Sequence, residues 1–142
     1  MSREPAGSLA AVVRRRAGGC CEYCHFPETA AELPFQVDHI IALKHGGETS
    51  DDNLAYACFY CNSYKGPNIA GVDPASSGAI RLFHPRRDRW ADHFQWDGTT
   101  LGAKTAVGRV TIAVLRLNHP DAITVREALL AVGSLPEVSR KL

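Results

Sequence analysis

The sequence predicts a small α+β protein. Three observations lead to this fold class: a β-rich run at residues 35–43, helical periodicity in the last third of the chain, and two paired cysteine motifs. The chain has 142 residues, enough for one domain of ordinary size or for a small module with an extension. Its 45% hydrophobic and 22% charged residues are typical of a globular protein and exclude disordered and fibrous classes.

Charge is distributed unevenly along the chain, although the net charge is only +1. Residues 20–65 carry seven acidic side chains and two lysines, whereas residues 1–19 and 98–142 are basic. An acidic middle suits divalent cations and basic flanks suit a polyanion, although solvated protein faces show the same segmentation. No run approaches the roughly 20 apolar residues of a membrane span, and the N-terminal stretch lacks the charge order of a secretory signal. We therefore expect a cytoplasmic protein without a membrane partner.

The cysteines predict a structural zinc site. Cys21 and Cys24 form one CxxC pair, and Cys58 and Cys61 form a second pair after a gap of 33 residues. The CxxC spacing lets two thiolates face one ion, and four thiolates make a closed tetrahedral zinc site. Cys20 could replace Cys21 with C-x3-C spacing, or lie beside the site as a free thiol; the spacing favours Cys21. A disulfide scaffold is not expected in a reducing compartment, and a redox pair is the alternative use of these thiols.

Short elements are expected around this metal site. Capping serine, helix-ending glycine and β-branched residues are the signals that place them. The expected elements are a helix from Ser8 to Gly18, a β-ribbon at residues 35–43 ended by the Gly46-Gly47 turn, capping residues at 49–52, and a short helix from Cys58 to Lys65 stopped by Gly66-Pro67.

The remainder of the chain is predicted to form an extension. Residues 67–80 are rich in Gly, Pro, Ser and Ala and are interpreted as a connector. Asp97-Gly98, between two β-rich runs, predicts a hairpin with a type I′ turn. Apolar residues at helical spacing predict one helix over 107–117, and Asp121 is expected to cap a second helix that runs to about Val132.

A set of motifs between and after the cysteine pairs resembles the HNH endonucleases. The resemblance covers roughly residues 20–66, and it is specific because the pieces occur in the family's order with both CxxC pairs in place. The pieces are Val37-Asp38-His39-Ile40, Gly46-Gly47, Asn53-Leu54, Cys61-Asn62 and Lys65-Gly66. The resemblance implies a ββα-metal module at residues 8–67, with its core motif at 20–66 and a four-cysteine zinc site that supports it. Residues 68–142 would be a hairpin and two helices packed on the module as one compact domain.

The resemblance implies an H-N-N variant with His39, Asn53 and Asn62 as its catalytic set. A phosphodiester needs an activated water and stabilisation of developing negative charge. The unperturbed pKa of a histidine side chain, about 6.5, suits a general base near neutral pH, so His39 is the candidate. Asp38 and Asn62 offer carboxylate and amide oxygens that suit Mg²⁺, with Mn²⁺ or Ni²⁺ as alternatives. Asp38 and His39 would face opposite sides of a regular strand, so the strand must bend or end there for both to serve one site. Asn53 would tie the loop that aims His39.

Basic side chains outside the catalytic set are candidate nucleic-acid contacts. They lie at the end of the second CxxC helix and in a segment, residues 81–97, that mixes arginines with Trp90 and Phe94. The candidates are Lys65, Arg86, Arg87 and Arg89. The alternative for the arginine segment is a salt-bridged connector.

Together these features predict a metal-dependent endonuclease that hydrolyses phosphodiester bonds of DNA, with structural zinc and a catalytic divalent ion and without an organic cofactor. The alternative is a zinc-stabilised adaptor that binds nucleic acid without cutting it. A cysteine-based redox protein is a third, weaker interpretation.

Overall fold

The computed structural model describes residues 8–134, which form two compact units. The first unit is the chain up to Ile69 together with His84–Asp88, and the second comprises Ala70–Phe83 and the chain from Arg89 onward. Both units mix helices with two-stranded sheets, so the predicted α+β class is confirmed. The expectation that residues 68–142 pack on the module as one compact domain stays a prediction.

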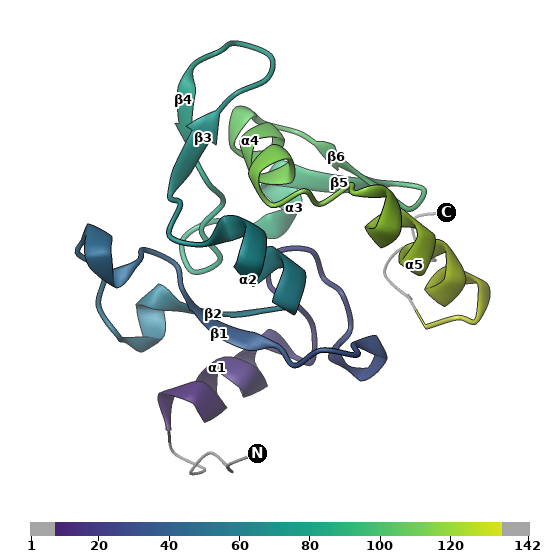
Figure 1. Ribbon diagram of the computed structural model, residues 1–142, viewed down its shortest axis with the longest axis horizontal. Helices are drawn as coiled ribbons and strands as arrows, with labels where there is room; N and C mark the ends of the chain where they lie inside the picture. The colour runs from purple at the N-terminus through teal and green to yellow at the C-terminus, as the bar shows by residue number, and fades with distance from the viewer. Residues whose placement is uncertain (1–7, 135–142) are drawn as a thin grey trace. The chain divides into compact units, whose positions relative to one another are not determined.

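The first unit is built from a two-stranded ribbon and two helices (Figure 1). Three single-turn 3₁₀ helices connect these elements, at Glu28–Ala30, Leu43–His45 and Asp51–Asn53. The elements, in chain order, are α1 (Leu9–Ala17), β1 (Gln36–His39), β2 (Leu54–Ala57) and α2 (Phe59–Lys65).

Helix α1 begins and ends at the residues that the sequence indicates. The Ser8 hydroxyl accepts a hydrogen bond from the backbone N–H of Ala11 at 3.1 Å, which satisfies one of the unpaired donors of the first turn. Gly18 ends the helix in the left-handed conformation, with φ +65°. Val13, which is fully buried, lies on the face that α1 turns toward the ribbon.

The β1–β2 ribbon is antiparallel, and its register pairs Gln36 with Ala57 and His39 with Leu54. Figure 1 shows α1 and α2 on opposite sides of this ribbon, which explains why every residue of β2 is buried. The predicted run at 35–43 was too long, because β1 ends at His39 and Leu43–His45 forms a 3₁₀ turn. The strand therefore ends at the Asp38-His39 pair.

Helix α2 follows β2 directly and carries the second cysteine pair. The Cys58 thiol caps it by accepting from the backbone N–H of Cys61, and Gly66 ends it with φ +50°, as predicted. The order β1, β2, α2 is consistent with a small ββα-metal module.

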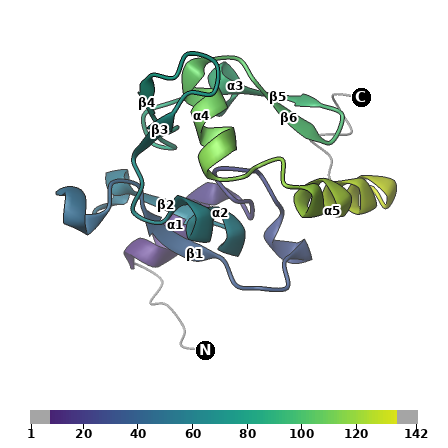
Figure 2. The same ribbon diagram turned by 45° about the horizontal axis from the view of Figure 1, so that its top comes forward.

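The second unit contains two hairpins around a helix. Figures 1 and 2 both show α4 between the β3–β4 and β5–β6 hairpins, and α4 contacts strands of both. The side chains of Phe83 and Phe94 meet edge to face in its core, at a centroid distance of 5.4 Å. The elements are β3 (Ala70–Val72), β4 (Ala79–Arg81), α3 (Trp90–His93), β5 (Phe94–Asp97), β6 (Thr100–Ala103), α4 (Ala106–Val114) and α5 (Pro120–Ala131).

Three details of the second unit differ from the sequence predictions. The expected connector at 67–80 contains the β3–β4 hairpin. In the second hairpin, Asp97 pairs with Thr100, so Gly98 is the first turn residue; it alone of the two turn residues has positive φ, which excludes the predicted type I′ turn. Helix α5 is capped by the side chain of His119, which accepts from the backbone N–H of Asp121.

Among residues 8–134, no helix combines the length and the apolar character needed to cross a membrane.

Candidate functional site

The four predicted zinc cysteines lie together in the first unit. The Sγ atoms of Cys21, Cys24, Cys58 and Cys61 are all within 4.8 Å of one another, and all four residues are buried. The Cys24 and Cys58 Sγ atoms are 3.8 Å apart, close to the edge of about 3.8 Å expected for a sulfur tetrahedron with Zn–S bonds near 2.3 Å. The backbone N–H groups of Cys24 and Cys61 donate to the sulfurs of Cys21 and Cys58 at 3.5 and 3.4 Å. The arrangement fits a structural zinc ion.

The positions of the two sulfurs show whether Cys20 or Cys21 belongs to the four-cysteine cluster. Cys20 forms an isolated β-bridge with Pro27 and does not belong to the thiol cluster, whereas Cys21 is fully buried within it. The CxxC spacing therefore identified the clustered cysteine correctly.

The two residues inside the first CxxC pair connect the zinc cluster to the ribbon. The backbone N–H of Glu22 donates to the carbonyl of Tyr56 at 2.8 Å, and the carboxylate of Glu22 accepts from the backbone N–H of Tyr56, also at 2.8 Å. The Tyr23 hydroxyl donates to Asp38 Oδ2 at 2.7 Å. The sequence analysis missed Tyr23, because neither its spacing nor its type distinguishes it from a core aromatic residue.

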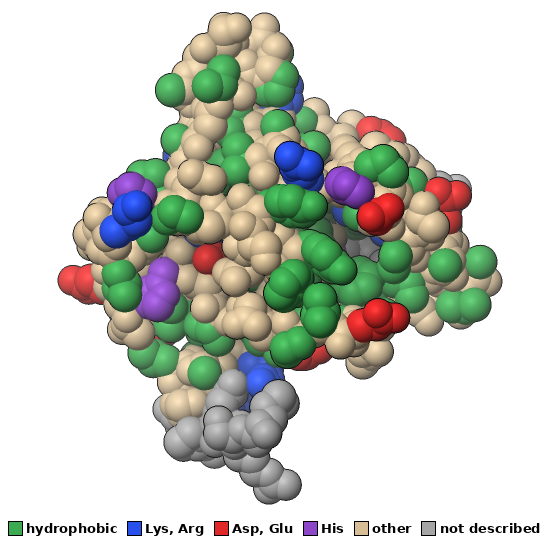
Figure 3. All heavy atoms as spheres, in the orientation of Figure 1, with side chains coloured by type: hydrophobic (Ala, Val, Ile, Leu, Met, Phe, Trp, Pro, Cys, Tyr) green, Lys and Arg blue, Asp and Glu red, His purple; other side chains and the backbone are tan. Residues whose placement is uncertain are grey.

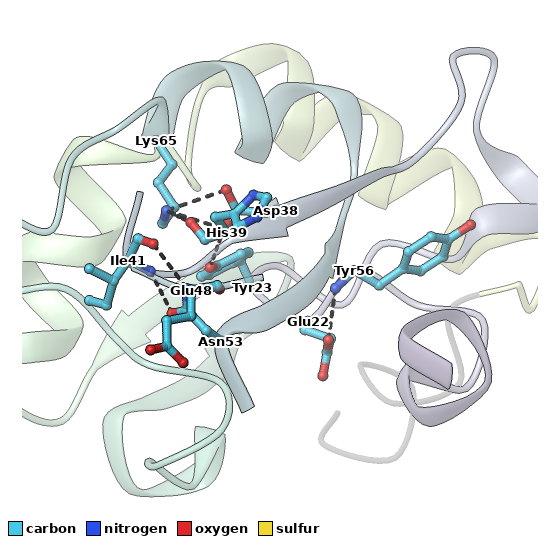
Figure 4. Close-up of polar contacts among 9 residues, drawn as sticks. All are labelled: Glu22, Tyr23, Asp38, His39, Ile41, Glu48, Asn53, Tyr56 and Lys65. Carbon is cyan, nitrogen blue, oxygen red and sulfur yellow. Dashed lines mark hydrogen bonds and ion pairs between the residues drawn. The ribbon is translucent and has the colours of Figure 1, made fainter. Parts of the chain in front are cut away.

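Asp38 is a buried carboxylate with a cation as its partner. It is 5% exposed, and the Lys65 ammonium lies 3.1 Å from Oδ2 and 3.3 Å from Oδ1 (Figure 4). Burial raises the pKa of Asp38, while the Lys65 charge and the Tyr23 hydrogen bond oppose that shift. Lys65 thus forms a buried ion pair within the first unit. The predicted contact of Lys65 with phosphate stays a prediction.

His39 is half-buried at the end of β1, one residue after Asp38. Its Nε2 atom lies 2.9 Å from the Thr49 hydroxyl, a contact that fixes the plane of the imidazole. Neighbouring side chains on a regular strand point to opposite faces, so Asp38 and His39 can serve one site only if the strand bends or ends between or after them. β1 ends at His39, so this requirement is met. Thr49 was interpreted only as a capping residue, so its contact with His39 was missed.

Asn53 closes the loop that follows His39. Its Nδ2 donates to the carbonyls of Ile41 at 3.0 Å and Glu48 at 2.8 Å, and its Oδ1 accepts from the N–H of Ile41 at 2.9 Å (Figure 4). The carbonyl of Asn53 also accepts from the N–H of Ile40 at 2.9 Å. Three of these bonds fix the backbone of Ile40 and Ile41, immediately after His39, and the fourth ties Glu48 on the other side of the loop. This arrangement is consistent with the orienting role that the family resemblance implies.

Asn62 lies on α2, half-buried and directly after Cys61. Within the described part of the chain, its side chain makes no hydrogen bond, so its amide oxygen is available as a ligand. Lys65 lies one turn later on the same helix and contacts Asp38, which shows that this helix faces the end of β1. The carboxylate of Asp38 and the amide of Asn62 are hard oxygen donors of the kind that Mg²⁺ takes, so the donor set fits a hydrated divalent ion in its chemistry.

The three candidate arginines have different surroundings. Arg86 is in the first unit, half-buried, and forms an ion pair with Glu22. Burial, with the nearby charge of Arg16, lowers the pKa of Arg86 to about 10. Arg87 and Arg89 are exposed. Their contacts with nucleic acid stay predictions; Figure 3 colours Lys and Arg side chains blue on the face that it draws.

The ribbon and helix beside the four-cysteine cluster form a small ββα unit with a histidine at the end of its first strand. The family model described as HNH endonuclease matches residues 21–68, entirely inside the first unit. Residues 21–68 therefore match an HNH endonuclease domain, and this match supports a nuclease-type function in general. The chain has no significant match to a curated protein or to a solved structure.

Proposed function

We propose that the protein is a metal-dependent endonuclease that hydrolyses phosphodiester bonds of DNA. The observation that carries the proposal is the setting of His39, which ends β1 next to a buried carboxylate while Asn53 ties down the loop behind it. Half-burial leaves the imidazole accessible to a water molecule, and the tied loop reduces the reorganisation that catalysis would otherwise require.

His39 is the general base in this proposal. When Nε2–H donates to the Thr49 hydroxyl, Nδ1 is the unprotonated nitrogen and accepts the proton of the attacking water. Asn53 acts as a positioning residue, because its hydrogen bonds go to the backbone rather than to the reacting groups. Asp38 and Asn62 would hold Mg²⁺ or a related divalent ion, which supplies electrostatic stabilisation to the phosphate and the leaving oxygen when bound.

The first prediction concerns His39. Zinc-loaded protein should nick or linearise supercoiled plasmid when Mg²⁺, Mn²⁺ or Ni²⁺ is present, and His39→Ala should slow cleavage by at least about 100-fold because the proton acceptor is lost. His45→Ala, which removes an exposed histidine of the same unit, is the control and should cleave like the parent.

A folded, zinc-containing His39→Ala protein that cuts as fast as the parent would contradict the assignment. A second candidate function is the non-catalytic adaptor, favoured by the engagement of Asp38 with Lys65 and Tyr23. Binding of DNA without cleavage under any of these ions, with one zinc per chain, would support the adaptor.

A further inference from the structure

The ion pair between Asp38 and Lys65 is a buried feature that the proposed hydrolysis does not use. The side chain of Lys65 is 1% exposed and that of Asp38 is 6% exposed. Removing two charges from water is costly, and a buried pair often adds no stability compared with apolar residues of similar size. The pair is therefore more informative as a functional feature than as a stabilising one.

The Lys65 ammonium spans the end of β1. Besides Asp38, it donates to the carbonyl of His39 at 3.1 Å, so one cation from α2 binds both residues that the proposed active site takes from this strand (Figure 4). Asn62, the other proposed ligand, precedes Lys65 by one turn of the same helix. The positively charged Lys65 ammonium therefore contacts the same carboxylate that is proposed to bind a divalent ion.

We propose that Lys65 is a built-in counter-ion of Asp38, which holds the carboxylate in place in the metal-free protein and competes with the divalent ion for it. The inference rests on the proposed function, because it takes Asp38 as a ligand of that ion. An incoming divalent cation is repelled by the ammonium, and this repulsion is weakly screened at a site with little exposure to water. The carboxylate oxygens are also shared with the ammonium and with the Tyr23 hydroxyl.

The test measures divalent-ion affinity directly. The probe is Mn²⁺, titrated into the full zinc-loaded chain and followed by electron paramagnetic resonance of the free ion. Lys65→Met removes the charge and keeps most of the apolar stem, and it should tighten Mn²⁺ binding by at least about tenfold. The matched control is Lys44→Met, which removes the same charge from an exposed position of the same unit and should leave the affinity within about twofold.

A second variant guards against misfolding. Lys65→Gln also removes the charge but retains an N–H donor for Asp38 and for the carbonyl of His39, so it disturbs the buried contacts less. It should likewise tighten Mn²⁺ binding, by about fivefold or more. Unchanged or weaker binding in either folded variant overturns the proposal.

The wild-type protein gives an independent measurement. In a lysine-acylation experiment read by mass spectrometry, Lys65 should be protected in the absence of Mn²⁺ and should react several-fold faster when Mn²⁺ occupies Asp38, whereas labelling of exposed Lys44 should not change. Labelling of Lys65 that does not respond to bound Mn²⁺ overturns the competition.

Failure of this proposal can be told apart from failure of the proposed function. Mn²⁺ binding that Asp38→Asn abolishes, without any tightening by the lysine variants, leaves the nuclease site standing and removes only the counter-ion. If no folded form of the protein binds Mn²⁺ through Asp38, the counter-ion proposal and the proposed metal site fail together.

Discussion

In the loop between β1 and β2, Gly47 and Asn53 share one small space. A Cβ atom placed on Gly47 would lie 1.7 Å from the carbonyl oxygen of Ile41 and 2.9 Å from Nδ2 of Asn53. The same carbonyl accepts a hydrogen bond from Asn53. Only a glycine at position 47 lets the chain pass closely enough for Asn53 to form hydrogen bonds with both sides of the loop. The proposed orientation of His39 therefore depends on the absence of a side chain at this position.

The second prediction follows from this close approach. Gly47→Ala should destabilise the first unit by about 3 kcal/mol or more, because backbone must move to relieve the overlap. It should also slow cleavage, because the loop after His39 shifts with it. Calorimetry of the zinc-loaded protein measures the first effect and plasmid cleavage the second.

Gly46→Ala is the control for this substitution. Gly46 has φ +92° and open space around its Cβ position, so alanine there meets only backbone strain, of about 1–2 kcal/mol. Equal effects of the two substitutions would show that the crowding at Gly47 is not what constrains the loop.

At the scale of elements, one carboxylate organises the β3–β4 hairpin and its contact with α4. Asp73 is 1% exposed and accepts from Arg109 through both oxygens, at 3.0 and 2.9 Å. It also accepts from the backbone N–H of Ala75 and from the hydroxyl of Ser76 within its own turn. These hydrogen bonds, that of Arg109 foremost, lower the pKa of Asp73.

The third prediction is an acid dependence of the second unit. A carboxylate with a lowered pKa in the folded state stabilises that state above its unfolded pKa of about 3.9, and the contribution is lost as pH falls below that value toward the folded pKa. Asp73→Asn should therefore reduce stability at pH 7 and flatten the fall in stability below about pH 4.5.

Tryptophan fluorescence is the appropriate measurement, because the two tryptophans of the chain, Trp90 and Trp96, both lie in the second unit. Asp92→Asn, at an exposed carboxylate of the same unit, should retain the acid dependence of the parent. If Asp73→Asn has the same pH profile as the parent, the ion pair with Arg109 does not stabilise the hairpin.

The elements differ in how far local sequence determines them. The cysteine pairs, the Ser8 cap and the helix at Cys58 depend on contacts within a few residues, so spacing and residue type were enough to predict them. Strand β2 was missed because both of its faces are buried and its Leu-Ala-Tyr-Ala sequence lacks alternation. The β3–β4 hairpin was interpreted as a connector because the Asp73–Arg109 pair that stabilises it joins residues 36 positions apart.

The candidate site shows the same division. The motif order predicted Asp38, His39, Asn53, Asn62 and Lys65 as candidate residues. It did not predict the contacts of Tyr23 and Lys65 with Asp38 or of Thr49 with His39, because these depend on the tertiary fold. A tyrosine between zinc cysteines and a threonine in a loop have many possible neighbours, and only the fold selects one.

At the scale of the whole molecule, the first unit is not one continuous stretch of chain. His84–Asp88 belongs to it, although the residues on either side belong to the second unit. The His84 ring accepts from the backbone N–H groups of Arg86 and Arg87, which shapes a turn that brings Arg86 to Glu22. Glu22 is the residue that joins the first cysteine pair to β2, so a segment beyond the family match supports the zinc site.

The fourth prediction tests this support. Arg86→Met leaves the Glu22 carboxylate without its arginine and should destabilise the first unit by about 3 kcal/mol, because it removes one partner of an ion pair whose side chains are each 12% exposed. Zinc should pass to a chromogenic chelator several times faster than from the parent. Arg87→Met, an exposed neighbour in the same turn, is the control, and equal zinc release from both variants would rule out this role for Arg86.

The position of Tyr23 between two zinc cysteines affects how cleavage assays on this protein are interpreted. Tyr23 donates to Asp38, so an agent that strips zinc also disturbs a residue proposed to hold the hydrolytic ion. Inactivation by a strong chelator therefore combines two losses, and Mg²⁺ added back alone should restore activity only to molecules that kept their zinc. Returning zinc and Mg²⁺ one at a time, in either order, distinguishes loss of the structural zinc from loss of the catalytic ion.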